Sequence, residues 1–185
     1  ADAMIGEALA SGGNVNTLKA KLDNLSTIVS EFLQGNSDAS KKIIAEAQNA
    51  LSLDQPANKS PRKPFHWALE FPEVIEPGGF DGIVGNPPFM GGQKITGNLG
   101  NNYREYLVEI IANGKKGSSD LCAYFFLNNA NLLKSDGSMG LLATNTISQG
   151  DTRDVGLQQL LDNKCVIFYA VPSMKWPGKA NLEVA

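Results

Sequence analysis

The sequence predicts an α/β fold, with helices on both faces of a partial parallel sheet that follows a helical N-terminal segment. Within residues 1–53, the stretch from Thr17 to Leu51 carries apolar side chains at three- and four-residue steps, which is the period of an amphipathic helix. From Phe65 onward, short apolar runs alternate with helical stretches, and this alternation is typical of parallel sheets. Because the Pro-rich residues 54–64 separate the two parts, we expect three segments: 1–53, 54–64 and 65–185.

Length and composition indicate about one globular domain. The chain has 185 residues, of which 42% are hydrophobic and 19% charged. No apolar run approaches the roughly 18 residues of a membrane span, so no membrane partner is expected. Cys122 and Cys165 form no CxxC pair, which predicts neither a zinc site nor a disulfide framework and makes a cytoplasmic location the default. The formal charge of −3 argues against nucleic-acid binding by bulk electrostatics alone, although a local basic face remains open.

Two helices are predicted in the N-terminal segment. The first begins near Thr17, and Gly35 ends it as a C-cap would. Ser37 or Asp38 can cap the second helix, which runs to about Leu51. The apolar face of the first helix consists of Leu18, Leu22, Leu25, Ile28, Val29, Phe32 and Leu33.

The sheet is predicted to begin with residues 80–85, "FDGIVG", as a short buried strand. Asn102 and Glu105 resemble a capping box, which predicts a helix. One side of that helix would carry Tyr103, Tyr106, Leu107, Ile110 and Ile111.

A buried helix is predicted next, because residues 118–137 are apolar nearly all round; Gly137 would end it. Cys122 and the aromatic residues Tyr124, Phe125 and Phe126 are therefore expected in the core. Residues 139–145 and 165–171 are predicted as two further strands, with a weaker helix near residues 152–163 between them.

The segment "NPPF" follows the strand at residues 80–85 directly. Consecutive prolines fix an extended path and lack backbone N–H donors, so they hold their neighbours rigidly. The Asn86 Oδ1 atom and the Pro87 carbonyl can each accept one hydrogen of a planar amino group at about 3 Å. Phe89 offers a ring for stacking on a flat base. In parallel sheets ligands bind beyond the carboxyl ends of strands, and Asn145 ends a second predicted strand.

The segment "NPPF", residues 86–89, which we call the elbow, resembles a known family together with its flanks. "NPPF" after a short strand resembles motif IV of the amino-group DNA methyltransferases that use S-adenosyl-L-methionine. The stretches "GGFDGIVGNPPFMGGQKITG" and "DLCAYFFLNNANLLKSDGSMGLLATNTI" are similar to type II restriction–modification enzymes, in which an adenine methylase is fused to, or works with, restriction activity. The resemblance covers about two-thirds of the chain, from Phe65 onward. It implies a partial Rossmann-like methyltransferase sheet and methyl transfer to N6 of an adenine flipped out of duplex DNA.

The resemblance also implies catalytic roles for the elbow. Asn86 and Pro87 would hold the adenine amino group, with Asn86 also near the cofactor. Pro88 would keep the elbow stiff, and Phe89 would stack on the adenine ring. Restriction or specificity domains or subunits would be further partners of the same system.

Residues farther along the chain would contact the DNA or the flipped base. Gly91 and Gly92 begin a glycine-containing loop beside the elbow, and Lys94 lies in it. Trp176, in "MKWPG", falls near where the family places an aromatic side chain on the other face of the base.

The sequence departs from the family in its cofactor motif. It contains no Gly-x-Gly, and "SGGN" near residue 12 follows no predicted strand. The main cofactor loop is therefore expected upstream, outside this chain, which begins Ala-Asp-Ala without an initiator Met. Such a piece is not expected to methylate DNA by itself. Asp120 and the strand ending at Asn145 would match later structural motifs of the family.

Two other functions remain open. A methylase of protein glutamine or of RNA guanine would share the elbow, but those enzymes usually carry Tyr after the prolines and lack the insert "MGGQKITGNLG". A non-catalytic methyltransferase-like scaffold would keep the fold without the cofactor, and titration with S-adenosyl-L-methionine separates it from an enzyme.

Several cations could meet phosphates, although scattered lysines are more often solvated surface. They are Lys94, Arg104, Lys115 and Lys116. The single histidine, His66, is predicted to be a packing residue.

Overall fold

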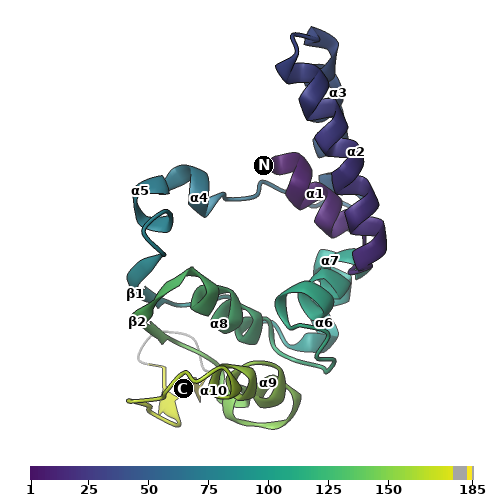
Figure 1. Ribbon diagram of the computed structural model, residues 1–185. Helices are drawn as coiled ribbons and strands as arrows, with labels where there is room; N and C mark the ends of the chain where they lie inside the picture. Colours follow the sequence, from purple (N-terminus) through teal and green to yellow (C-terminus); the bar gives the residue numbers. More distant parts are fainter. Residues whose placement is uncertain (177–182, 185) are drawn as a thin grey trace. The chain divides into compact units, whose positions relative to one another are not determined.

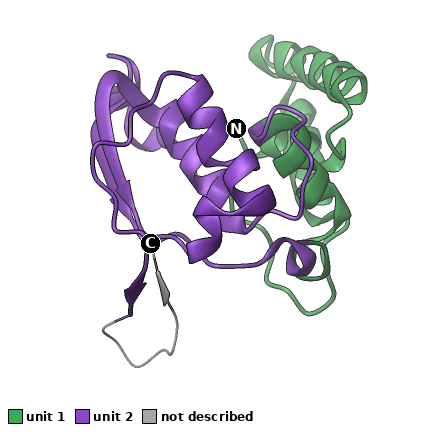
Figure 2. Cartoon of the chain, turned by 90° about the horizontal axis from the view of Figure 1, so that it is seen from below, with its two compact units in different colours: residues 1–66, 96–110 green, residues 67–95, 111–185 purple. Residues whose placement is uncertain are grey.

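The computed structural model describes residues 1–176 and 183–184 (Figure 1). The chain is mixed α/β with a small parallel sheet, which confirms the predicted fold class. It divides into two compact units (Figure 2): unit 1 comprises Ala1–His66 and Thr96–Ile110, and unit 2 comprises Trp67–Ile95 and Ile111–Ala185. Among the described residues, no helix is long and apolar enough to cross a membrane.

Unit 1 is helical. Its helices are α1 (Asp2–Ala10), α2 (Val15–Leu33), α3 (Ser37–Ser52) and α7 (Asn101–Tyr106), and α7 leads into a π-helical turn at Leu107–Ile111. Ala3, Leu25 and Ala47, one from each of the first three helices, form a small buried cluster. Helix α1 was not predicted. Its segment, "DAMIGEALA", has little polar face from which a helical period can be read, and it is stabilised by packing on α3.

The ends of α2 and α3 follow local rules. Gly35 has φ 94° and donates its N–H to the Phe32 carbonyl at 3.0 Å, which confirms its predicted role as a C-terminal glycine. The predicted cap of α3 is wrong by one residue. The side chain of Asn36, not of Ser37, accepts the Asp38 N–H at 3.1 Å, so Ser37 is already helical.

Arg62 holds the Pro-rich connector against unit 1. Its guanidinium donates to the carbonyls of Leu51, Leu53 and Leu99 at 2.9, 3.0 and 2.7 Å. It also lies 5.7 Å from the centre of the Tyr103 ring. One planar cation therefore satisfies carbonyls at the ends of α3 and of α6 (Gly92–Leu99).

His66, predicted to be a packing residue, also makes a polar contact. Its Nε2 atom lies 2.5 Å from the Asp2 Oδ1 atom, so the side chain ties the end of the connector to the start of α1.

Unit 2 contains the sheet. Its elements are α4 (Trp67–Glu70), α5 (Pro72–Ile75), β1 (Phe80–Gly85), α8 (Leu121–Leu132), β2 (Leu133–Leu141), a 3-10 turn at Asn145–Ser148, α9 (Gly150–Val155), α10 (Leu157–Asp162), β3 (Met174–Lys175) and β4 (Glu183–Val184). Strands β1 and β2 run parallel, with Ile83 opposite Met139 and Gly85 opposite Leu141. Helix α8 packs along β2 (Figure 1).

Strand β1 is not buried as predicted. Val84 is 89% exposed, and β1 pairs only with β2 among the described strands. At the entry to β1, Gly79 has φ 118°, and a side chain there would collide with the Leu132 carbonyl. This position therefore requires glycine.

Helix α8 ends five residues earlier than predicted. Leu133 is already extended, with φ −81° and ψ 149°, because it pairs with Phe80 at the start of the sheet. Gly137 lies inside β2, where a Cβ would come within 2.8 Å of the Phe80 carbonyl. The second strand accordingly ends at Leu141, before Asn145.

The predicted capping box is also wrong. Helix α7 has Gly100 at its N-cap, and the Asn102 N–H donates to the Asp54 carboxylate at 2.7 Å. Glu105 instead pairs with Arg104 at 2.6 Å. A carboxylate from a distant part of the sequence replaces the local cap.

Two further predictions need correction. Residues 165–171 form no strand. Val166, Phe168 and Tyr169 are 79%, 77% and 78% exposed. Without a neighbouring strand, β propensity alone does not produce a strand.

Phe125 is exposed at 39%, whereas Cys122 and Tyr124 are buried as predicted. The weaker helix near residues 152–163 is confirmed as α9 and α10, which meet at Gly156.

Replacing Arg62 should destabilise unit 1. Arg62→Ala removes three charge-assisted hydrogen bonds, so we expect the free energy of unfolding to fall by about 2 kcal/mol in urea titrations. Lys63→Ala, at an exposed neighbouring position, is the matched control and should leave it unchanged. Equal stability of the two variants would contradict the role given to Arg62.

Candidate functional site

The carboxyl ends of β1 and β2 lie at one edge of the sheet. Gly85 is opposite Leu141, and the Leu142 N–H donates to the Gly85 carbonyl at 3.0 Å. The elbow that starts at Asn86 therefore leaves the sheet beside the chain that follows β2. This agrees with the expectation that both segments lie where parallel sheets bind ligands.

Within the elbow, burial alternates. Asn86 and Pro88 are exposed, whereas Pro87 is buried. Phe89 is half-buried and packs against a core cluster that contains Cys122, Ala143 and Ile147. Pro87 and Phe89 thus anchor the elbow, and the Asn86 amide remains accessible from solvent.

Asp120 fastens the exit of the elbow to α8. Its Oδ1 atom accepts the Cys122 N–H at 3.0 Å as the N-cap of α8, and the Met90 N–H at 3.3 Å. In return the Leu121 N–H donates to the Met90 carbonyl at 2.9 Å. The Asp120 N–H donates to Thr152 Oγ1 at 3.1 Å, so α9 is held at the same point.

The two glycines after the elbow differ. At Gly92 a Cβ would lie 2.5 Å from the Ser118 carbonyl carbon, so only glycine permits this close approach of two backbones. At Gly91 a Cβ would meet no atom within 4 Å. Lys94 is exposed in the first turn of α6. The proposed DNA contacts of these three residues stay predictions.

Trp176 is half-buried, and it is the last residue of the continuous described segment. The chain just before it reaches the carboxyl-end edge of the sheet, because Asn145 Nδ2 donates to Ser173 Oγ at 3.5 Å. Whether its ring meets a base stays a prediction.

Cys122, beside the elbow, is a buried thiol that is not suited to nucleophilic catalysis. Burial, reinforced by the neighbouring Asp120 carboxylate, raises the pKa of the Cys122 thiol to about 12. Among the described residues, no group of histidine, cysteine, aspartate and glutamate side chains could hold a metal ion. The arrangement suits hydrogen bonding and stacking instead.

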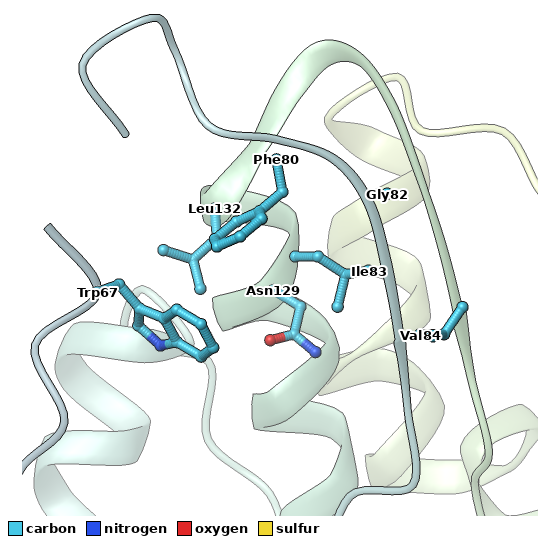
Figure 3. A pocket seen from close by; sticks show the side chains of 7 residues that line it. All are labelled: Trp67, Phe80, Gly82, Ile83, Val84, Asn129 and Leu132. Atoms are coloured by element: carbon cyan, nitrogen blue, oxygen red, sulfur yellow. The ribbon is translucent and has the colours of Figure 1, made fainter. Parts of the chain in front are cut away.

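The sequence did not predict a groove on one face of β1. It has a volume of about 280 Å³, and Figure 3 shows the residues that line it: Trp67, Phe80, Gly82, Ile83, Val84, Asn129 and Leu132. The Trp67 and Phe80 rings meet edge to face at 5.4 Å. The lining has no titratable side chain. A molecule in the groove would contact apolar side chains and the Asn129 amide, and no group there could transfer a proton.

Comparison with known proteins gives one family. The family model described as "Eco57I restriction-modification methylase" matches residues 12–170. A putative type II restriction enzyme and methyltransferase of Methanocaldococcus jannaschii is 32% identical over 88 residues. That alignment covers 48% of this chain but 7% of the relative's length. No solved structure matches the chain.

The two cysteines should differ sharply in reactivity. With a pKa near 12, Cys122 is almost entirely the neutral thiol at pH 8, and it is also buried. Cys165 is exposed. We expect Ellman's reagent at pH 8 to titrate one thiol per folded chain and two after unfolding in urea. Cys165→Ser is the control and should abolish the native reaction; fast labelling of that variant would contradict the burial of Cys122.

Proposed function

The chain belongs to the Eco57I restriction-modification methylase family, and from this premise we propose that it forms the substrate-gripping part of a DNA methyltransferase. We propose further that the acceptor is the exocyclic amino group of an adenine flipped out of duplex DNA. The observation that carries this proposal is an anchored elbow at the carboxyl end of β1 with an accessible Asn86.

The elbow would act by accepting hydrogen bonds. The Asn86 Oδ1 atom and the Pro87 carbonyl would take the two hydrogens of the amino group. These bonds favour a pyramidal nitrogen and direct its lone pair away from the elbow. The lone pair of the nitrogen can then attack the methyl group directly.

Phe89 would stack on the flipped base with the part of its ring that packing leaves accessible. The core contacts of the ring support this role, because a side chain held on one side loses little conformational entropy when it binds. Its packing also means that Phe89 contributes to stability as well as to binding.

S-adenosyl-L-methionine is the proposed donor and would supply an electrophilic methyl group. The described residues do not fit a cradle for it: the sequence has no Gly-x-Gly, and the described parallel sheet has two strands. We propose that the cofactor loop belongs to polypeptide outside these 185 residues. The far greater length of the Methanocaldococcus relative supports this division. Restriction or specificity domains would be partners of the same enzyme.

Asn86→Ala should abolish methyl transfer in an enzyme that joins this chain to its cofactor-binding part. The truncation removes one of two acceptors for the amino group, and because Asn86 is exposed, the fold should be unaffected. Transfer of tritiated methyl groups to duplex DNA measures the effect, and circular dichroism checks folding.

Asn163→Ala supplies the control, since Asn163 is also exposed but lies at the end of α10. It should methylate at the wild-type rate. An undiminished rate of methyl transfer in Asn86→Ala would contradict the role proposed for the elbow.

Phe89→Leu should weaken extrusion of the base. Leucine retains most of the apolar contact with the core cluster but offers no aromatic face, so the flipped state should lose about 1–3 kcal/mol. A 2-aminopurine at the target position reports extrusion by its fluorescence. Phe89→Tyr, which keeps a ring, is the matched control; equal fluorescence for the leucine and tyrosine variants would contradict stacking.

A further inference from the structure

A short loop between the π-helical turn and α8 carries two adjacent cations. We call residues 113–118, "NGKKGS", the lysine loop. Lys115 and Lys116 are both exposed, and neither forms an ion pair among the described residues.

Backbone N–H groups of the loop donate two hydrogen bonds that hold it in place. The Lys115 N–H donates to the Ala112 carbonyl at 2.9 Å, and the Ser118 N–H donates to the Asp151 carboxylate at 2.6 Å. At its start, Asn113 and Gly114 have φ of 53° and 77°, which turns the chain sharply. The lysine side chains therefore extend from an anchored backbone.

The lysine loop lies directly beside the elbow. Ser118, its last residue, packs so closely on Gly92 that a Cβ there would lie 2.5 Å from the Ser118 carbonyl carbon. Gly92 is three residues beyond Phe89, and Lys94 follows it by two. Lys94, Lys115 and Lys116 thus belong to two segments that meet next to the candidate substrate site.

Among the described residues, the carboxylates of Asp120 and Asp151 form no ion pair with Lys115 or Lys116. Asp120 is buried and accepts the backbone N–H groups of Met90 and Cys122. Asp151 accepts the Ser118 N–H. In a chain with a net charge of −3, this concentration of cations is a local property, which the overall composition conceals.

We propose that Lys115 and Lys116 contact backbone phosphates of the DNA beside the flipped base. Phosphate contacts carry no sequence information but fix the position of a duplex on a protein, so these lysines are positioning residues. The inference rests on the proposed function, because it takes the elbow as the place where the base enters.

The dependence of DNA affinity on salt tests the proposal. Each neutralised phosphate contributes about 0.9 to the slope of log affinity against log salt concentration, so Lys115→Ala/Lys116→Ala should lower the slope by about 1–2. Fluorescence anisotropy of the full chain with a labelled 20-base-pair duplex, between about 20 and 150 mM salt, measures it. Both side chains are exposed and form no ion pair within the described part of the chain, so the double variant should fold, as circular dichroism will verify.

Lys41→Ala/Lys42→Ala is the matched control, because it removes the same charge from an adjacent pair on α3. It should leave the slope within about 0.3 of the wild-type value. Lys115→Arg/Lys116→Arg should restore the wild-type slope, since arginine also binds phosphate. An equal fall in both alanine double variants would overturn the proposal by showing that only net charge matters, and so would an unchanged slope in Lys115→Ala/Lys116→Ala.

Failure of this inference is distinguishable from failure of the proposed function. If Asn86→Ala retains methylation while Lys115→Ala/Lys116→Ala lowers the salt slope, the phosphate contacts are supported and the role of the elbow is contradicted. If Asn86→Ala is inactive while the slope is insensitive to both lysines, the elbow stands and the lysine loop is overturned.

Discussion

One buried carboxylate fastens the chain that leaves the elbow. The Oδ1 atom of Asp120 accepts N–H groups from Met90, just beyond the elbow, and from Cys122, in the first turn of α8. Because β2 begins at the residue after α8 ends, a constraint on α8 is passed directly to the strand that pairs with β1. Asp120 therefore links the exit of the elbow to the first turn of the helix that precedes β2.

Rigidity and accessibility are divided between alternate residues of the elbow. Pro87 is buried and Phe89 packs on the core, whereas Asn86 and Pro88 face solvent. A site whose anchors are part of the core needs little reorganisation when its ligand arrives. The proposed chemistry of Asn86 depends on this arrangement, because hydrogen-bond acceptors act best when their positions are set before binding.

Local signals in the sequence were sufficient for several elements. Gly35 ends α2 through its own backbone, and residues 80–85 form a strand followed by the elbow, as their pattern indicated. Predictions failed where distant residues decide the outcome. Gly137 was predicted to end a helix, but it lies in β2, where it allows the strand to approach the Phe80 carbonyl closely. Asn102 was predicted to cap a helix, but its backbone N–H donates to the Asp54 carboxylate. Neither partner can be inferred from neighbouring residues.

The two lysines of the lysine loop are visible in the sequence, but its position beside the elbow required the structure, because Gly92 and Ser118 are far apart in the chain.

The crossover from β1 to β2 has an architectural consequence. It leaves unit 2 after Ile95, contributes Thr96–Ile110 to unit 1, and then returns to form the lysine loop and α8. Within unit 1 those crossover residues are bound by the Arg62 guanidinium and the Asp54 carboxylate. No single scission of the polypeptide can therefore liberate both units intact. Cutting the chain at the Pro-rich connector would remove α1, the helix on which α7 packs, so unit 1 would lose part of its interior.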